Sequence, residues 1–460
     1  MIKNIYSFFV VLFLISIIYA CRQSKPFDSD EYNEVFTADY HTAIDDGAGA
    51  YAHPLIGLSA REEAFHDLGD GFFETNFVPN QANYHASGLG PLYNNISCVS
   101  CHPSDGRGKA PLPGEVINSM LFKLALSGLD SKGFPNKVPG FGGQLQDKAI
   151  IGSAIEGKVD VQYIESNFQF PDGETVKLRK PIYTLTNLYQ PISSQVIVSP
   201  RLARPVYGVG FLESISEESI LKNVDEMDVD GDGISGKANY VYDFVNNKEK
   251  VLGRIGWKAS VANIKSQVTR ALNEDIGITS SVVPDEQIKG QIQEPNSSGI
   301  ELPDSIVDAL TFYIRTLSVP ARRDVKNQQI IQGKKLFSIA GCASCHTPNH
   351  QTEINPAFKP LSGLNIFPYT DLLLHDMGLD LADGFSEFEA KGNEWRTPPL
   401  WGIGLTQKVN GHNNFLHDGR ARNFTEAILW HGGEAIKAKT KFVNYTKNER
   451  LALIKFLESL

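Results

Sequence analysis

The chain has 460 residues, of which 42% are hydrophobic and 21% charged, as in ordinary soluble globular proteins. At roughly 150 residues per domain, it is long enough for two or three domains. A net charge of −10 and a pI near 5.6 argue against nucleic acid or an anionic membrane surface as the partner.

The first residues, MIKNIYSFFVVLFLISIIYAC, have the pattern of an export signal. One lysine precedes an apolar run that is shorter than the roughly 20 residues needed to span a bilayer. Ala20 before Cys21 resembles a bacterial lipoprotein signal, in which residues 1–20 form the signal peptide and Cys21 is lipidated. A plain signal peptide and an uncleaved anchor are the alternatives. All three place the protein in the periplasm or at the surface of a bacterium, and residues 21–45 would form a lipid-anchored tether.

Two C-x-x-C-H motifs, in NNISCVSCHPSDGRGK and AGCASCHTP, contain four of the five cysteines. This motif attaches c-type haem, because its spacing lets both sulfurs reach the two vinyl groups of one porphyrin edge and the histidine then faces the iron. A redox dithiol would not require the histidine, and zinc would need four ligands from motifs that look self-contained. The sequence therefore predicts two covalently bound haem c groups, held by Cys98, Cys101 and His102 and by Cys342, Cys345 and His346.

Between the two motifs, residues 158–183 alternate like edge strands. Further on, DVDGDGISG resembles the front half of an EF-hand calcium loop, with Asp228, Asp230 and Asp232 at positions 1, 3 and 5. Position 12 is Asn239 instead of glutamate, which would lower the affinity unless another segment supplies ligands. We expect calcium here, and a metal-free Asp/Gly turn is the alternative.

A short repeat indicates a diverged duplication. PVYGVGF at 205–211 and PLWGIGL at 399–405 each follow a haem motif, with Arg204 and Arg396 close upstream. We therefore predict a mainly α protein built from two cytochrome c-like haem domains. The first, 46–322, would be enlarged by insertions that contain short strands and the calcium loop, and the second would cover 323–460.

The second domain should begin and end with helices that pack together. Apolar residues recur at helical spacing in QIIQGKKLFSIA (329–340) and again in residues 448–460. Gly333 would allow these two helices to cross closely. The stretch SVPARR (318–323) interrupts the helical pattern and marks the expected boundary.

From about Ala50 to its end, the chain resembles the bacterial di-haem oxidoreductase family, described as putative peroxidases. The motifs that carry the resemblance are GLGPLYNNISCVSCHPSDGRG, YGVGFLESI, DGDGISGKANYV, GRIGWKA, PYTDLLLHDMG, EWRTPPLWGIGL and FLHDGRARNFTEAILWHGGEA. More distantly, the chain is similar to bacterial di-haem cytochrome c peroxidases and to the related methylamine-utilisation enzyme. Those proteins have an N-terminal haem that reacts with peroxide and a C-terminal haem that transfers electrons.

The distant resemblance implies three catalytic residues. Trp257 matches the tryptophan between the haems, and Gln267 and Asp275 match the glutamine and the acid near the peroxide, with Glu274 as the adjacent alternative. A carboxylate over an open iron can move a proton between the peroxide oxygens. A buried tryptophan and acids near helix ends also occur with purely structural roles.

The same comparison suggests iron ligands. His431 stands where the peroxidases have the methionine ligand of the electron-transfer haem, and would give a bis-histidine haem of lower potential. Met377 is its competitor, and a hydrogen-bonded core histidine is the other alternative. For the first haem, the peroxidases' displaceable distal histidine is missing, since no histidine occurs between His102 and His346. The iron of the first haem would have an open coordination position, or its second ligand would be Met120 or one of the upstream histidines His41, His53, His66 and His85.

The resemblance therefore implies an exported di-haem c-type oxidoreductase with peroxidase-like chemistry. Electrons would come from a small redox protein or a quinol-linked donor, pass from the C-terminal to the N-terminal haem, and reduce peroxide or another small oxidant. Two alternatives stay open. One is a non-catalytic electron-transfer protein or redox partner of an iron or substrate uptake system, and the other is oxidation of an organic or protein substrate.

Overall fold

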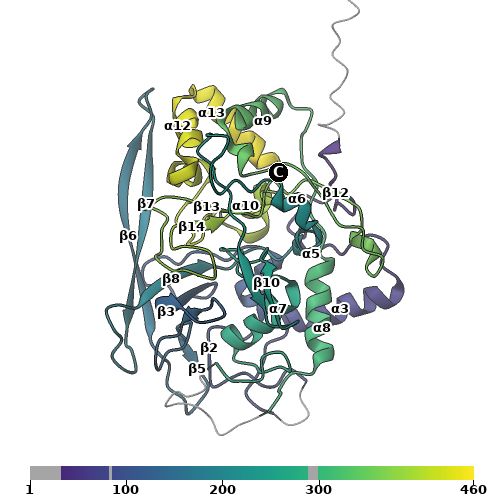
Figure 1. Ribbon diagram of the computed structural model, residues 1–460, viewed down its shortest axis with the longest axis vertical. Coiled ribbons are helices and arrows are strands. Elements are labelled where there is room, and N and C mark those ends of the chain that lie inside the picture. Colours follow the sequence, from purple (N-terminus) through teal and green to yellow (C-terminus); the bar gives the residue numbers. More distant parts are fainter. Residues whose placement is uncertain (1–32, 82–84, 288–298) are drawn as a thin grey trace, which may run out of the picture.

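The computed structural model describes residues 33–81, 85–287 and 299–460 (Figure 1). The signal segment and Cys21 lie outside the described residues. The chain is 29% helical and 20% strand, and its strands form several small sheets. The prediction of a mainly α protein with two cytochrome c-like domains is therefore wrong. The described residues contain no helix that is both long enough and apolar enough to cross a membrane.

Two pairs of long helices repeat the same packing in the two halves of the chain. In the first half, α3 (Ala60–Glu74) packs against α8 (Asp304–Thr316), and in the second half α9 (Gln328–Ala340) packs against α13 (Lys447–Ser459). Capping boxes begin α3 and α13, because in each a side-chain hydroxyl and a glutamate satisfy the first free amides.

A glycine lies at each crossing. A Cβ atom on Gly69 of α3 would lie 2.2 Å from the carbonyl oxygen of Ala309, and one on Gly333 of α9 would lie 1.9 Å from that of Ala452. Both distances are far shorter than any real carbon–oxygen contact, so only glycine fits. The predicted role of Gly333 is confirmed, and Gly69 plays the same role in the first half.

The remaining elements are short. The other α-helices are α4 (Cys98–Cys101), α5 (Val209–Ser214), α6 (Glu217–Leu221), α7 (Ile264–Ala271), α10 (Thr406–Asn410), α11 (Phe424–Trp430) and α12 (Ile436–Asn444). The strands outside the long hairpin are β1 (Thr37–Tyr40), β2 (Leu92–Tyr93), β3 (Met120–Leu129), β4 (Pro135–Asn136), β5 (Lys148–Ala149), β8 (Ile197–Leu202), β9 (Tyr240–Asp243), β10 (Lys248–Leu252), β11 (His350–Gln351), β12 (Asn365–Ile366), β13 (Leu374–Asp376) and β14 (Glu394–Arg396).

The longest strands form a hairpin along one flank of the molecule (Figure 1). β6 (Lys158–Gln169) and β7 (Thr175–Thr186) pair antiparallel over their whole length, as the alternating sequence predicts. The hairpin contacts the second half through buried Arg450, which bonds Asp172 at 2.6 Å and Glu174 at 2.7 Å. Strands β3, β4 and β8 form a separate three-stranded sheet. These strands supply much of the β content that the prediction underestimated.

The two PVYGVGF-like segments face each other in the centre. Gly208 and Gly402 both have positive φ, 73° and 68°, and each begins a helical turn. The hydroxyl of Tyr207, in the first segment, donates to the carbonyl oxygen of Trp401, in the second, at 3.0 Å. The repeated sequence therefore marks a contact between the two halves.

The first described residues pack onto this core. Glu34 is 5% exposed and forms an ion pair with Arg322, and it accepts a hydrogen bond from Tyr369 at 2.8 Å. Residues 33–45 include strand β1, so this part of the expected tether is folded against the body.

Candidate functional site

The first C-x-x-C-H motif forms the helical turn α4, with His102 at its end. The Nδ1 atom of His102 donates to the carbonyl oxygen of Arg204 at 2.6 Å, which leaves Nε2 for a metal. Burial lowers the pKa of His102 to about 4, so the imidazole is neutral, as a metal ligand must be. The ring of Phe73, four residues after Gly69, lies 6.3 Å from the imidazole.

The second motif repeats this arrangement. His346 Nδ1 donates to the carbonyl oxygen of Tyr369 at 3.0 Å, and burial lowers the pKa of His346 to about 4. The ring of Phe337, four residues after Gly333, lies 6.2 Å from this imidazole. Both predicted proximal histidines thus present a free Nε2.

Each motif borders a cavity. The cavity at His102 has a volume of about 210 Å³ and the one at His346 about 320 Å³, many times the roughly 10–15 Å³ that a single water needs. Both cysteines of each motif line the same cavity as their histidine. Each cavity therefore offers two sulfurs and one imidazole to the same group.

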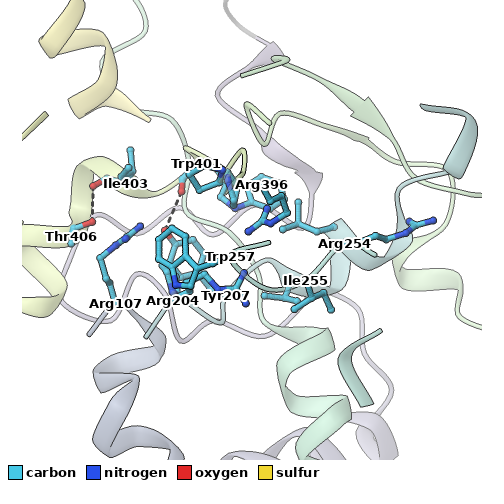
Figure 2. A pocket seen from close by; sticks show the side chains of 15 residues that line it. Arg107, Arg204, Tyr207, Arg254, Ile255, Trp257, Arg396, Trp401, Ile403 and Thr406 are labelled. Carbon is cyan, nitrogen blue, oxygen red and sulfur yellow. Dashed lines mark hydrogen bonds between the residues drawn. The ribbon is translucent and has the colours of Figure 1, made fainter. Parts of the chain in front are cut away.

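A cluster of arginines lines a smaller pocket (Figure 2). Arg204 also lines the first cavity, and Arg107 and Arg396 also line the second. Arg107 and Arg396 are 5% and 2% exposed, and Arg204 lies beside them. Burial lowers the pKa of all three, and the charges of the other arginines lower that of Arg204 further. Nε and Nη1 of Arg107 have no hydrogen-bond partner among the described residues. Unpaired buried cations require anions, and the propionate groups of haem are such anions, so the donor set fits two haems.

Trp257 lines both cavities and the arginine cluster. Its Nε1 donates to the carbonyl oxygen of Leu202 at 2.9 Å, which fixes the indole. The guanidinium carbons of Arg204 and Arg107 lie 5.9 and 6.0 Å from its ring centre. The tryptophan expected between two haems therefore lies between the two cavities, next to the residues suited to propionates.

The predicted acid and glutamine border the first cavity together with Trp257. Gln267 lies on α7, and Asp275 lies in the wide helical turn Leu272–Ile276 that follows it. Burial raises the pKa of Asp275 to about 6. The structure thus brings the whole predicted trio to one cavity.

Glu274, the alternative acid, has the opposite electrostatic character. Burial alone would raise its pKa, but Arg270 and Lys123 outweigh burial and hold the pKa at about 2. Lys123 Nζ lies 2.5 Å from its carboxylate and Arg270 Nη2 3.3 Å. Glu274 is therefore a fixed anion, whereas Asp275 can exchange a proton near neutral pH.

The structure describes no second protein ligand at the first cavity. Among the described residues that line it, His102 is the one histidine, and no methionine is present. Met120 begins β3 and belongs to a separate apolar cluster. The upstream histidines have other contacts: His41 with Pro360, His53 with Asp45, His66 with Thr316 and His85 with the ring of Phe72.

The second cavity offers two candidates for a second ligand. His431 and Met377 both line it. His431 follows α11, and its Nδ1 donates to the carbonyl oxygen of Ala427 at 2.7 Å, so its Nε2 is free. His375 also lines the cavity, but Asp371 and Glu434 bond its two ring nitrogens, each at 2.8 Å. The hydrogen bonds thus favour His431 as the second imidazole.

The Asp-rich loop lies at the edge of the second cavity. Carboxylate oxygens of Asp228 and Asp230 lie within 4.8 Å of one another and of Asp225, which the sequence pattern did not suggest. Asp232 instead accepts a hydrogen bond from the amide of Ile234 at 2.7 Å. The amide of Asn239 donates to the carbonyl oxygen of Lys258 at 2.7 Å, so position 12 is engaged elsewhere.

Sequence reasoning missed the residues that surround the predicted ones. Gln144 donates to Asp275, and Lys123 pairs with Glu274. Lys123 lies on β3 and Gln144 in the loop between β4 and β5, both far from these acids in the sequence. Arg107 lies only five residues after His102, inside the segment that contains the first haem motif, but the sequence pattern assigns it no role. Arg107 and Gln144 are buried and Lys123 is half-buried, which only the folded chain reveals.

A comparison with curated proteins gave no match. Residues 37–460, which include both motifs and all residues that line the two cavities, match the family described as "Di-haem oxidoreductase, putative peroxidase". This family implies haem cofactors, in agreement with the two cysteines of each motif, the neutral histidines and the unpartnered guanidinium nitrogens of Arg107. The chain therefore belongs to the di-haem oxidoreductase family.

Proposed function

We propose that this protein is an exported di-haem c-type peroxidase, with its haems covalently attached to the four motif cysteines. The haem at His346 would accept electrons from a donor, and the haem at His102 would use them to reduce peroxide. The observation that supports an enzyme best is the first cavity, which a neutral histidine and a proton-exchanging acid both line, with no second protein ligand among the described residues.

Asp275 would move the proton. In its ionised form it can take a proton from one peroxide oxygen and return it to the other as the O–O bond breaks. Gln267, which lines the same cavity, would orient the peroxide by a hydrogen bond. Glu274 keeps its charge throughout and balances Lys123 and Arg270.

Trp257 would provide the electron path. Its indole borders both cavities and the arginine cluster, so it shortens the gap between the two redox groups. Its fixed Nε1 hydrogen bond keeps the ring in one orientation. With His346, His431 would hold the second haem through two imidazoles, a ligand set that would suit electron transfer.

The proposal is tested by EPR and optical spectra of the haem-loaded protein, both oxidised and half-reduced, with calcium present. A high-spin signal that disappears on adding peroxide would support the enzyme. If both irons are low-spin in both states and their spectra do not change on adding peroxide, the non-catalytic electron carrier would be supported instead. Oxidation of an organic substrate also requires an open iron, and product analysis separates it from peroxide reduction.

The proposed function includes two further sites, a lipid anchor at Cys21 and a calcium site in the Asp-rich loop. Lipidation at Cys21 would anchor the protein to a membrane, and loss of radiolabelled fatty acid in Cys21→Ser would test it. Calcium would bind at Asp225, Asp228 and Asp230, and a calcium-dependent rise in melting temperature that is lost in Asp228→Asn would support that site.

A further inference from the structure

We infer that the opening of the second cavity is a docking surface for an acidic redox protein. This inference rests on the proposed function, because it assumes that electrons enter at the haem of His346. The surface consists of helix α12 with its neighbours Ile339 and Leu379.

The positive charge comes from one short helix. α12 carries Lys437, Lys439 and Lys441 and no acidic residue, in a chain whose net charge is −10. All three lysines line the second cavity. The helix therefore reverses the overall charge of the protein at the place where a redox partner would have to approach.

Two of these lysines are held without losing their charge. Lys437 Nζ donates to the carbonyl oxygen of Asp232 at 2.5 Å, and Lys441 Nζ donates to that of Ile339 at 3.0 Å. Both side chains remain exposed. Because a carbonyl oxygen is neutral, these contacts orient the ammonium groups while leaving their charge for a partner.

The nearby carboxylates are directed into their own loop. Asp228 accepts from the amide of Gly233 at 2.9 Å, Asp230 from Asp232 at 3.0 Å and Asp232 from Ile234 at 2.7 Å. Glu434, also at this cavity, bonds His375 and Ser235. Amide donors offset part of these negative charges, whereas the lysines have no such compensation from α12 itself.

Apolar side chains accompany the lysines. Ile339 is 62% exposed, Ile436 49% and Leu379 90%. Ile339 precedes the cavity-lining residue Ala340, and Ile436 lies between the lining residues Ala435 and Lys437. Leu379 lies two residues after Met377, which also lines the cavity. A small apolar area with charges around it suits a transient electron-transfer complex, where charge guides the encounter and apolar contact is brief. An acidic one-electron redox protein matches this surface.

The test follows electron transfer without peroxide, so that it does not depend on peroxidase activity. The haem-loaded protein is reduced and mixed in a stopped-flow apparatus with oxidised plastocyanin, an acidic acceptor, or with oxidised mitochondrial cytochrome c, a basic one. In each case one electron leaves the haem of His346 and reduces the acceptor, and the low-spin haem band reports the rate. If the reduced protein shows no low-spin haem band at all, the proposed function fails, and not only the docking inference.

We expect plastocyanin to react faster than cytochrome c at low ionic strength and to slow down as salt is added. The double variant Lys437→Glu/Lys441→Glu should lower the rate constant with plastocyanin about tenfold or more, within the range typical of electrostatic steering. The matched control Lys248→Glu/Lys250→Glu, on exposed β10, makes the same change of charge elsewhere and should have little effect.

Three results would overturn the inference. A faster reaction with cytochrome c would assign the surface to a basic partner through the Asp-rich loop. Rates that do not depend on salt for either acceptor would point to a small-molecule donor such as a quinol. An equal loss in the control would show that net charge alone is responsible. If the glutamate variant does not fold, the variant Lys437→Gln/Lys441→Gln and the salt dependence of the unmodified protein still test whether the lysines bind the acidic partner.

Discussion

Gln144 and Asp275 are joined by a hydrogen bond of 2.8 Å, from the side-chain amide of Gln144 to the carboxylate. Gln144 is fully buried, and its amide also donates to Asn94 Oδ1 at 2.7 Å and to the carbonyl oxygen of Glu274 at 3.0 Å. A donor bond stabilises the ionised carboxylate and so lowers its pKa, against the larger effect of burial. Gln144 therefore holds Asp275 in place and, together with the larger effect of the Lys123 charge, offsets part of the rise in pKa that burial causes.

Gln144→Leu should raise the pKa of Asp275. A hydrogen bond to a charged group contributes roughly 1.5–3 kcal/mol, which corresponds to about one to two pH units. The rise of kcat/KM for peroxide with pH should therefore shift to higher pH by that amount. Gln146→Leu is the control, because Gln146 donates to the carbonyl oxygen of Glu274 at 2.8 Å and to Gln287 at 3.3 Å. A pH profile that moves equally in both variants would contradict a specific role of Gln144.

In the unmodified protein, kcat/KM for peroxide should rise with pH through about 6, the pKa of Asp275. Below that pH the carboxyl group is protonated and cannot accept a proton, and above it the carboxylate can. Asp275→Asn should remove this rise and lower kcat/KM by roughly 10²- to 10⁴-fold, the usual contribution of a general acid–base group. Optical spectra of both haems should stay unchanged, and Asp308→Asn, on the surface of α8, should leave the kinetics intact. Unaltered turnover in Asp275→Asn would reject the assignment.

His431→Ala should change the spin state of the haem at His346. Loss of the second imidazole leaves one axial position to water, so the low-spin spectrum of this haem should become high-spin. Met377→Leu is the matched control and should leave the spectrum low-spin, since the free Nε2 of His431 is the better donor to the same cavity. The reverse pattern, with a change only in Met377→Leu, would make Met377 the ligand.

The features that the sequence predicted are those that a short stretch of neighbouring residues encodes. The spacing in C-x-x-C-H identified both histidines, alternation identified the hairpin of β6 and β7, and the helical period identified α9. Trp257 and Asp275 came from the resemblance. Gln144, in contrast, is 131 residues from Asp275, and the chain gives no local signal for such a contact.

The error in fold class has a similar origin. Strands β3 and β8 pair across a gap of about 70 residues, from Met120 with Leu202 to Ala125 with Ile197, a separation that local patterns do not reveal. The haem motifs and terminal helices have strong local signals and dominated the prediction. The short strands, which depend on tertiary pairing, were underestimated as a result.

The two glycines of α3 provide a direct test of the helix packing. Gly69→Ala should destabilise the protein by about 3 kcal/mol, the upper part of the range for overpacking, because the new methyl group would meet the backbone of α8 at Ala309. Gly71→Ala, two residues along the same helix, has no atom within 4 Å of the added Cβ. It should be neutral or stabilising by roughly 0.5–1 kcal/mol, since alanine loses less backbone entropy in a helix. Urea unfolding followed by circular dichroism measures both. Equal stability of the two variants would show that α3 and α8 are further apart than described, and Gly333→Ala should reproduce the effect of Gly69→Ala in the second half.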